Sequence, residues 1–304
     1  MEVLSLRHVS KSFGEVCAVS DLTLTVERGR VFGLLGPNGA GKTTTIRMVM
    51  NIIGPDTGEI LVLGKPNRDG VLQRVGYLPE ERGLYPKLPV GEVLELLAVL
   101  RGMERRDARR KIRLWLERFE LAEWEKKPVE QLSKGMQQKV MFIGAVLHEP
   151  EIAILDEPFT GLDPISAGEV KDAILELVKK GSTVILSTHL MEQVEKLCDE
   201  ICLINQGRAV LVGELTEVKR RFGEERVVLA YRGEPHFLQD PSLVAGYDDY
   251  GHYVEIRPRK GVTPQAILER AVREVEVRRF EIRQPSLNEI FIAVVKGASP
   301  EVAP

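Results

Sequence analysis

The sequence predicts an α/β protein with a parallel sheet, an inserted helical lobe, and a small α+β domain at the C-terminal end. Strand-like apolar runs alternate with helical periods on both sides of a mostly helical stretch at residues 90–147. Such alternation is typical of parallel sheets. Beyond residue 226 the periodicity changes to strand, strand, helix, strand, helix. We therefore place the domains at residues 1–220 and 221–304, the boundary near residues 220–223, and the lobe at about residues 85–148.

Composition and charge limit the classes of function. The chain has 304 residues, 43% of them hydrophobic, which is enough to bury the cores of one larger and one smaller domain. Its 42 Lys and Arg residues stand against 45 Asp and Glu residues, which gives a net charge of −3. This balance lacks the basic surplus with which proteins neutralise nucleic-acid phosphates. We therefore expect no nucleic-acid partner.

The N-terminal segment and the cysteines indicate a cytoplasmic protein. Residues 1–10 alternate apolar and polar side chains, which fits a strand and not a signal peptide. Apolar stretches such as residues 93–100 are far shorter than the roughly 20 residues that span a bilayer, so a membrane role needs a partner. Cys17, Cys198 and Cys202 form neither a disulfide framework nor a metal-ligand cluster. We expect all three to be reduced and packed.

The elements of the first half follow from the apolar pattern. Residues 3–9 and 22–29 are predicted to be strands at the edge of a sheet. An apolar strand at residues 31–36 leads directly into a loop and a helix at residues 36–53, and further strands follow at residues 58–64 and 74–79.

The helical stretch carries arginines on one side of a helix. Interleaved acidic side chains favour a solvated face over a lipid-binding or nucleic-acid-binding surface. The arginines are Arg105, Arg106, Arg109, Arg110 and Arg113, and the acidic residues are Glu104, Asp107 and Glu117.

Strand and helix alternate again after the lobe. Residues 151–158 and 182–189 are predicted to be buried strands, and the helix between them begins at Pro164 and ends at Gly181. A hairpin at residues 201–213 and a basic helix at residues 214–223 complete the first domain.

A phosphate-binding loop is predicted at residues 36–43, which read GPNGAGKT. They satisfy the G-x-x-x-x-G-K-[ST] pattern after an apolar strand and at the start of a helix, the context that this pattern requires. Backbone N–H groups of such a loop converge on phosphate oxygens, the lysine reaches the outer phosphates, and the hydroxyl binds Mg²⁺. The predicted nucleotide-binding residues are Gly36, Pro37, Asn38, Gly39, Ala40, Gly41, Lys42, Thr43 and Thr44.

Two carboxylates follow the apolar run of residues 152–155. In open parallel sheets, ligands lie at the carboxyl ends of the strands, where this run delivers Asp156 and Glu157. Asp156 is expected to orient the Mg²⁺ shell. Glu157, directed elsewhere because strand side chains alternate, is expected to polarise a water for in-line attack. Together they predict hydrolysis of the nucleotide.

An unusual helix start lies at residues 132–139, which read LSKGMQQK. Ser133 can cap this helix, but Gly135 weakens its first turn, and apolar residues begin only at Val140. A second glycine-containing helix start, in a chain that already has a phosphate loop, requires an explanation.

That explanation comes from a resemblance to the ATP-binding cassette (ABC) ATPases. The motifs GPNGAGKTT, LSKGM, ILDEP, GLD and STH occur in the order and context of that family, over about the first 215 residues. LSKGM resembles the LSGGQ signature, with Lys134 and Met136 in place of a glycine and the glutamine. The resemblance implies a P-loop NTPase fold of the ABC type, with ATP and Mg²⁺. It also implies that Ser133 and Gly135 contact the γ-phosphate of a facing subunit in a head-to-tail dimer.

The resemblance implies roles for four further residues. His189 matches the switch histidine that touches the γ-phosphate and helps to position the attacking water. Asp163, in GLD, matches the loop that communicates across the dimer, and Phe13 is expected to stack on adenine. Glu80 stands where the family commonly has a glutamine that reaches Mg²⁺ and links the helical lobe to the membrane subunit. A glutamate still supplies an oxygen ligand.

The remaining sequence resembles a bacterial exporter group. Residues 83–103 are similar to exporter-type members, including those linked to drug or sodium extrusion. Residues 280–295 resemble the end of a small α+β accessory domain that follows the cassette in that group. Whether this tail stabilises a dimer, regulates the cassette or only packs on it is open at this level.

The resemblance implies an ATP-hydrolysing subunit of an exporter-type transporter, whose integral membrane permease is a separate polypeptide. It also implies that the chain is cytoplasmic and is held at the inner face of the cell membrane through that permease. The dimer is either a homodimer or a heterodimer with another ABC ATPase. The alternative is an ABC ATPase that acts on ribosomes or nucleic acid. The single cassette, the absence of long insertions between Lys42 and Asp156, and the mild acidity argue against it. A P-loop kinase would leave LSKGM, Glu157 and His189 without a purpose.

Overall fold

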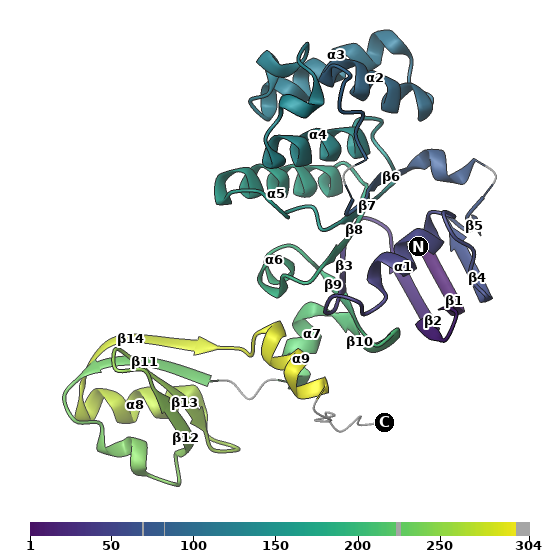
Figure 1. The fold of residues 1–304 in the computed structure, drawn as a ribbon. Helices are drawn as coiled ribbons and strands as arrows, with labels where there is room; N and C mark the ends of the chain where they lie inside the picture. Colours follow the sequence, from purple (N-terminus) through teal and green to yellow (C-terminus); the bar gives the residue numbers. More distant parts are fainter. Residues whose placement is uncertain (69, 82, 223–225, 296–304) are drawn as a thin grey trace. The chain divides into compact units, whose positions relative to one another are not determined.

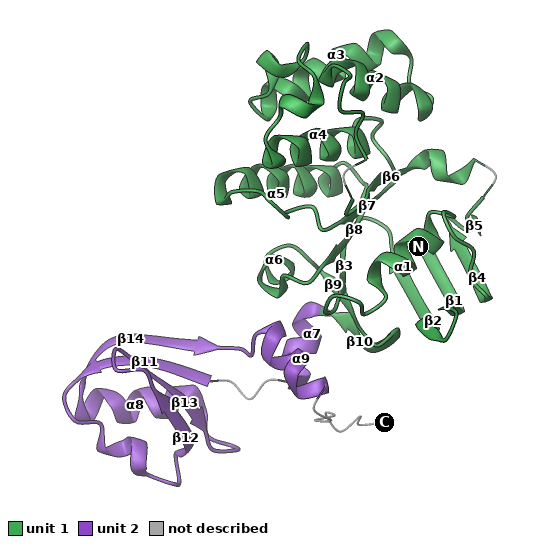
Figure 2. Cartoon of the chain, in the orientation of Figure 1, with its two compact units in different colours: residues 1–214 green, residues 215–304 purple. Residues whose placement is uncertain are grey.

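The computed structural model describes residues 1–68, 70–81, 83–222 and 226–295 (Figure 1). The chain divides into two compact units, Met1–Glu214 and Leu215–Pro304 (Figure 2). The sequence pattern predicts a later boundary, near residues 220–223. Residue 223 and residues 296–304 of the second predicted domain lie outside the described residues. The structure thus assigns helix α7 (Leu215–Phe222) to the second unit.

A six-stranded sheet forms the centre of the first unit, in the order β10-β9-β3-β8-β7-β6. All its neighbouring strands are parallel except β9 and β10. Every residue of β3, β7 and β8 is buried, as expected for parallel strands covered on both faces. The predicted α/β fold with a parallel sheet is therefore confirmed. The strands are β3 (Val31–Leu35), β6 (Val75–Leu78), β7 (Ile152–Asp156), β8 (Thr183–Thr188), β9 (Glu200–Asn205) and β10 (Arg208–Glu214).

The N-terminal strands form a separate antiparallel sheet in the order β2-β1-β4-β5. Helix α1 (Lys42–Val49) contributes Ile46 and Met48 to a core cluster that includes side chains from both sheets. This cluster fixes the start of α1 against the carboxyl end of β3. The strands of this sheet are β1 (Glu2–Phe13), β2 (Val16–Glu27), β4 (Thr57–Val62) and β5 (Lys65–Pro66).

The inserted lobe contains α2 (Val90–Leu100), α3 (Arg105–Arg118) and α4 (Lys134–Val146). Three aromatic rings join α3 to α4. The Phe142 ring packs edge-on against Trp115 and Phe119, with centroid distances of 6.1 Å and 5.9 Å. Short 3₁₀ helices lie at Val71–Arg74, Ala122–Trp124 and Val129–Gln131, and two further helices of the unit are α5 (Pro164–Lys179) and α6 (Met191–Glu195).

The second unit is a four-stranded antiparallel sheet with α8 packed on one face. The sequence pattern predicts two strands before the first helix of this sheet, whereas the described residues form three, β11, β12 and β13. The strand with the weakest sequence signal is β12, because its residues VAGYDD include a glycine and two aspartates, which are uncommon in strands. The elements are β11 (Arg226–Arg232), a 3₁₀ turn at His236–Gln239, β12 (Val244–Asp249), β13 (Val254–Pro258), α8 (Pro264–Glu274), β14 (Glu276–Arg283) and α9 (Leu287–Val295).

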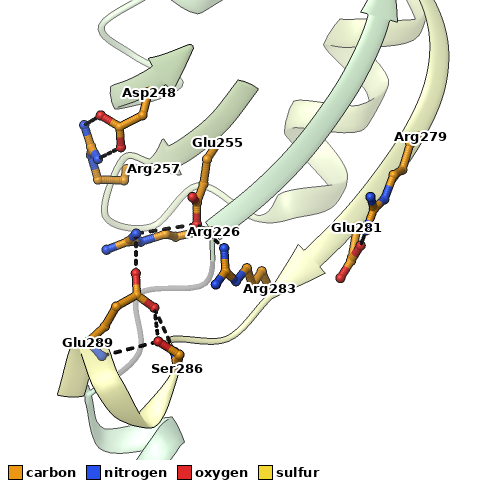
Figure 3. A network of polar contacts seen from close by, with 9 residues as sticks. All are labelled: Arg226, Asp248, Glu255, Arg257, Arg279, Glu281, Arg283, Ser286 and Glu289. Carbon is orange, nitrogen blue, oxygen red and sulfur yellow. Dashed lines mark hydrogen bonds and ion pairs between the residues drawn. The ribbon is translucent and has the colours of Figure 1, made fainter. Parts of the chain in front are cut away.

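A network of charged side chains connects this sheet to α9 (Figure 3). Glu255 on β13 is buried and lies 3.5 Å from Arg226 and 3.4 Å from Arg283. Arg226 also reaches Glu289 of α9 at 2.8 Å, and Glu289 accepts two hydrogen bonds from Ser286. Because both arginines are partly exposed, Glu255 gains compensation for its burial while they keep contact with water.

Within the described residues, no helix is long and apolar enough to cross a membrane.

We expect Phe142→Ala to destabilise the lobe by about 3–5 kcal/mol, because it leaves a cavity between two aromatic rings. Phe142→Leu keeps most of the volume and should cost less than about 1.5 kcal/mol. Urea unfolding followed by tryptophan fluorescence measures both, since Trp115 contacts the substituted ring. Equal unfolding midpoints for the two variants would contradict the packing of Phe142 between Trp115 and Phe119.

Candidate functional site

The phosphate loop packs against the ends of its neighbouring strands. A Cβ atom on Gly36 would lie 2.2 Å from the carbonyl oxygen of Ile204, and one on Gly41 would lie 2.4 Å from that of Ala18. Gly36 and Gly41 also have φ values of 152° and 107°, which L side chains rarely adopt. No side chain caps α1 after Gly41. The backbone N–H groups at the start of α1 are therefore available to an anion.

Lys42 lies across this loop in the structure. Its Nζ donates to the carbonyl oxygens of Gly36 at 2.8 Å and Pro37 at 3.2 Å. Burial lowers the pKa of Lys42, and three nearby carboxylates oppose that shift. The carboxylates are those of Glu157, Asp156 and Glu80.

Asp156 ends β7 as a fully buried carboxylate. Neither of its oxygens makes a hydrogen bond of normal geometry with the described residues, nor does the buried Ser187 hydroxyl. Burial raises the pKa of Asp156, although the hydroxyls of Ser187 and Thr43 are close enough to oppose the shift. A buried acidic side chain without a partner is costly, so this carboxylate fits a site that receives a cation.

The oxygen atoms near Asp156 suit Mg²⁺. Thr43 Oγ1 lies 3.3 Å from Glu80 Oε2, so the hydroxyl and this carboxylate are neighbours at the start of α1. Among the described residues, no group of three or more His, Cys, Asp or Glu side chains is placed to hold a metal ion. Mg²⁺ usually binds through one or two carboxylates and completes its shell with phosphates and water.

Glu157 leaves the strand in a left-handed conformation, with φ of 50°. Its Oε1 lies 2.7 Å from His189 Nδ1 and accepts the His189 N–H at 3.1 Å, while its Oε2 accepts from Thr188 Oγ1 at 3.0 Å. Strand alternation is expected to set the direction of the Glu157 side chain, but β7 has already ended at Asp156, so the positive φ of Glu157 sets it. A strained backbone at such a position is typical of functional sites.

Most predicted site residues line one cavity of about 400 Å³ at the carboxyl ends of β3 and β7. His189 is not part of the cavity lining, but its ring contacts Glu157, which is. Gly36 and Pro37 hold the buried end of the loop through Lys42. The predicted residues in the lining are Asn38, Gly39, Ala40, Gly41, Lys42, Thr43, Thr44, Glu80, Asp156 and Glu157.

Phe13 does not line this cavity. It lies at the end of β1 with 51% of its surface exposed, and Lys11 Nζ is 5.6 Å from its ring centroid. An exposed ring at this position remains open to a stacking partner.

Three other predicted residues also lie outside the cavity lining. Ser133 caps α4 by accepting the N–H of Met136 at 3.2 Å. A Cβ on Gly135 would lie 3.3 Å from the carbonyl oxygen of Gly161, next to the GLD motif. Asp163 caps α5, and hydrogen bonds from the hydroxyl and N–H of Ser166 lower its pKa. The start of α4 and the GLD loop therefore meet within one chain, apart from that chain's own phosphate loop.

Several residues at the site are not predicted by any sequence motif. Gln138 is buried in α4, and its Nε2 donates to the carbonyl oxygens of Glu157 and Pro158, which holds the turn after β7. Its signal in the sequence is a polar side chain on the buried side of a helix. Thr188, which holds Glu157, and Gln206, which lines the cavity, each lie at or after the end of a strand.

The expectation that all three cysteines are packed is wrong for Cys17. Cys198 and Cys202 are buried, but Cys17 is exposed and lines the cavity beside the phosphate loop. The reason is its place in the β1–β2 hairpin, where it pairs with the exposed Ser12 near the turn.

Comparisons with known proteins agree with this arrangement. The family model described as "ABC transporter" matches residues 19–160, and that of the "ATP-binding protein DrrA1-3-like, C-terminal domain" matches residues 213–295. The chain is 42% identical to the uncharacterized ABC transporter ATP-binding protein YhaQ of Bacillus subtilis (strain 168), over 96% of this chain and 98% of that protein. It is 31% identical to the linearmycin resistance ATP-binding protein LnrL of the same organism, over 95% and 97% of the two chains.

A solved structure described as an ATP binding subunit of an ABC transporter is similar as well. It has a TM-score of 0.69 and 34% sequence identity, and the match covers 72% of this chain and 93% of that one.

We expect Asp156→Asn to stabilise the protein by about 1 kcal/mol or more at pH 7–8 in the presence of EDTA, because it removes a buried charge. Since burial raises the pKa of Asp156, the folded protein binds a proton more readily than the unfolded chain. The stability of the unsubstituted protein therefore falls as the pH rises from the ordinary value of 3.8 through the folded-state pKa.

The advantage of Asp156→Asn should accordingly grow across that pH window and disappear below it, as measured by urea unfolding at several pH values. Asp172→Asn, at an exposed position of α5, is the matched control and should change little. A constant advantage at all pH values would rule out the burial of a charge as its cause.

Proposed function

The chain belongs to the family of ABC transporter ATP-binding subunits and is an ATPase, and from this premise we propose that it drives export through a separate membrane permease. The observation that carries the proposal is the single cavity in which the phosphate loop, Asp156 and Glu157 converge. Relatives named for linearmycin resistance and Nod factor export support the direction of transport. On this proposal the chain is cytoplasmic and is held at the inner face of the membrane by the permease.

Binding of ATP begins at the phosphate loop. The free N–H groups at the start of α1 receive the phosphates, and Lys42 exchanges the carbonyl oxygens of Gly36 and Pro37 for phosphate oxygens. Thr43, Asp156 and Glu80 would hold Mg²⁺, which neutralises phosphate charge when it is bound. The exposed ring of Phe13 is available to stack on adenine.

Glu157 is the proposed general base. Its carboxylate accepts hydrogen bonds from Thr188 and from the His189 backbone, which fix it at the cavity. From this position it accepts a proton from the attacking water. The ring of His189, 43% exposed, lies beside it and is placed to contact the γ-phosphate and the water.

The site needs a second cassette to be complete. Ser133, Gly135 and Asp163 lie apart from the phosphate loop of their own chain. Ser133 accepts the N–H of Met136, and the other N–H groups of the first turn of α4 have no partner within the helix, as at any helix start. In a head-to-tail dimer, each α4 would meet the ATP bound to the facing subunit. Either a second copy or a related ABC ATPase satisfies this requirement.

A groove of about 320 Å³ on the first unit suits the permease. It lies between α2, α4 and the residues after β6, close to Glu80. Its lining is mostly apolar, although it includes Arg101, and it fits an apolar helix or loop of a membrane subunit. Closure of the cassettes would act on the permease there. The lining includes Tyr77, Pro79, Leu84, Tyr85, Leu97 and Leu100.

Affinity purification from gently solubilised native membranes, followed by mass spectrometry, tests the proposal. We expect a multi-span membrane protein in stoichiometric amounts. Recovery of ribosomal proteins or nucleic acid without any membrane protein would instead support a role apart from transport.

We expect Glu157→Gln to lower steady-state ATP hydrolysis at least about 100-fold, because the carboxylate no longer accepts a proton. ATP binding should persist, so an ATP-dependent dimer should accumulate. Phosphate release and size-exclusion chromatography with light scattering measure the two effects. Glu123→Gln, at an exposed position of the lobe, is the matched control. Substantial turnover by Glu157→Gln would remove the role of Glu157 as base.

We expect Leu100→Glu to abolish recovery of the permease while leaving ATP binding intact, because it places a charge in the apolar groove. Leu114→Glu is the control, since Leu114 is similarly exposed but does not line this groove. Co-purification from membranes compares the two variants. Equal loss of the permease in both would mean that the groove is not the docking site.

A further inference from the structure

Strand β14 is at the edge of the second unit's sheet. The order of that sheet is β12-β13-β11-β14, so within the described residues β14 has one neighbouring strand, β11 (Figure 1). Its eight residues, Glu276–Arg283, therefore present a row of backbone N–H and C=O groups on their outer side. Such an edge is a template for another strand.

One face of β14 continues the apolar core outward. Opposite residues of paired strands share a face, and Val277, Phe280 and Ile282 lie opposite three residues of the core region. Ile282 is nevertheless 51% exposed, although its neighbour Val227 is fully buried. The core face thus ends at an uncovered apolar edge. The pairs are Val277 with Tyr231, Phe280 with Leu229, and Ile282 with Val227.

The other face of β14 carries alternating charges. Arg279, Glu281 and Arg283 lie opposite Ala230, Val228 and Arg226, and Glu276 lies opposite Arg232. Figure 3 shows Arg279 and Glu281 beside each other on this strand, where they form an ion pair. The pairing register skips Arg278, which makes this residue a β-bulge.

We propose that β14 pairs in antiparallel orientation with β14 of a second copy of this chain, about a two-fold axis at Phe280. When Arg278 is left unpaired as a bulge, each apolar residue of one β14 faces an apolar residue of the other, and each paired charged residue faces one of opposite charge. Phe280 faces its own copy, Val277 faces Ile282, Arg279 faces Glu281, and Glu276 faces Arg283.

This register is selected by charge. Moving the two-fold axis to Glu281 places Glu281 opposite itself and Arg279 opposite Arg283. Moving it to Arg279 places Arg279 opposite itself and Glu281 opposite Glu276. Like charges directly opposite each other destabilise a strand pair, so both neighbouring registers are disfavoured. The same charges discourage pairing with unrelated strands.

The β14 contact gives the second unit, here called the accessory unit, a partner of its own. The proposed cassette dimer does not determine what the accessory unit binds. The β14 contact joins two four-stranded sheets into one, and it does not involve nucleotide. Two copies of the chain are required, but neither Glu157 nor the start of α4 takes part. The two proposals can therefore fail separately.

Cysteine cross-linking of the full chain in the absence of nucleotide tests the register. All variants carry Cys17→Ser, which removes the exposed cysteine. The two remaining native cysteines, Cys198 and Cys202, are buried. Phe280→Cys should cross-link to its own copy, because the two Cβ atoms of an opposite pair lie about 5 Å apart. Val277→Cys alone should not, because its two copies are roughly 15 Å apart along the strands.

The double variant Val277→Cys/Ile282→Cys tests the same register independently, in case Phe280→Cys does not fold. Its cysteines face each other between the two copies but lie too far apart to cross-link within one chain. Absence of a cross-linked dimer for both Phe280→Cys and the double variant would overturn the proposal. Cross-linking of Val277→Cys alone to the same extent would also overturn it.

Charge reversal gives a second test on exposed side chains. Glu281→Arg places like charges opposite each other at two symmetry-related positions, so cross-linking through Phe280→Cys should fall about fourfold or more. Arg279→Glu/Glu281→Arg restores opposite charges and should restore the yield. Equal yields for all three proteins would contradict the register. ATP-dependent dimerisation of Glu157→Gln, measured in parallel, reports on the cassette dimer alone.

Discussion

The phosphate loop packs so closely on the adjoining strands that only a residue without a side chain fits at Gly36 and Gly41. The carbonyl oxygens of Ile204 and Ala18 occupy the space that a Cβ would need. This constraint fixes the position of α1 between the two sheets, and with it the free N–H groups that face the cavity. The order of the central strands then brings the ends of β7 and β8 to the same place. The chemistry of the site therefore depends on backbone packing before it depends on any charged side chain.

Three residues of the same site have environments that are uncommon in folded proteins. Asp156 is buried without a hydrogen-bond partner among the described residues, Glu157 has a left-handed backbone, and Lys42 is held by carbonyl oxygens. A cation would give Asp156 the partner that it lacks, and phosphate oxygens would replace the carbonyl oxygens that accept from Lys42. Ligand binding and stability are therefore opposing demands on one cluster. Hydrogen bonds from Gln138 to the carbonyl oxygens of Glu157 and Pro158 hold the strained turn in place.

Buried strands and capped helices could be predicted because the apolar runs and the residues Ser133, Pro164 and Gly181 determine them locally. β12 could not, since pairing with β13 overrides its low strand propensity. The direction of Glu157 also lies beyond sequence patterns, because it depends on a φ value that tertiary contacts impose. Motif spacing identifies the residues of the phosphate loop, but not the exposure of Cys17 or the support given by Thr188 and Gln138.

The two proposed contacts between subunits place different demands on the partner. The cassette contact is satisfied by any chain that presents a phosphate loop and a signature helix, so it permits both a homodimer and a heterodimer. The β14 contact is isologous, because every residue meets a position of the same strand. Its charges pair correctly only when the partner strand repeats the pattern Glu276, Arg279, Glu281 and Arg283. A related cassette that lacks this pattern would lose the pairing, so the accessory unit favours two copies of this chain over a mixed pair.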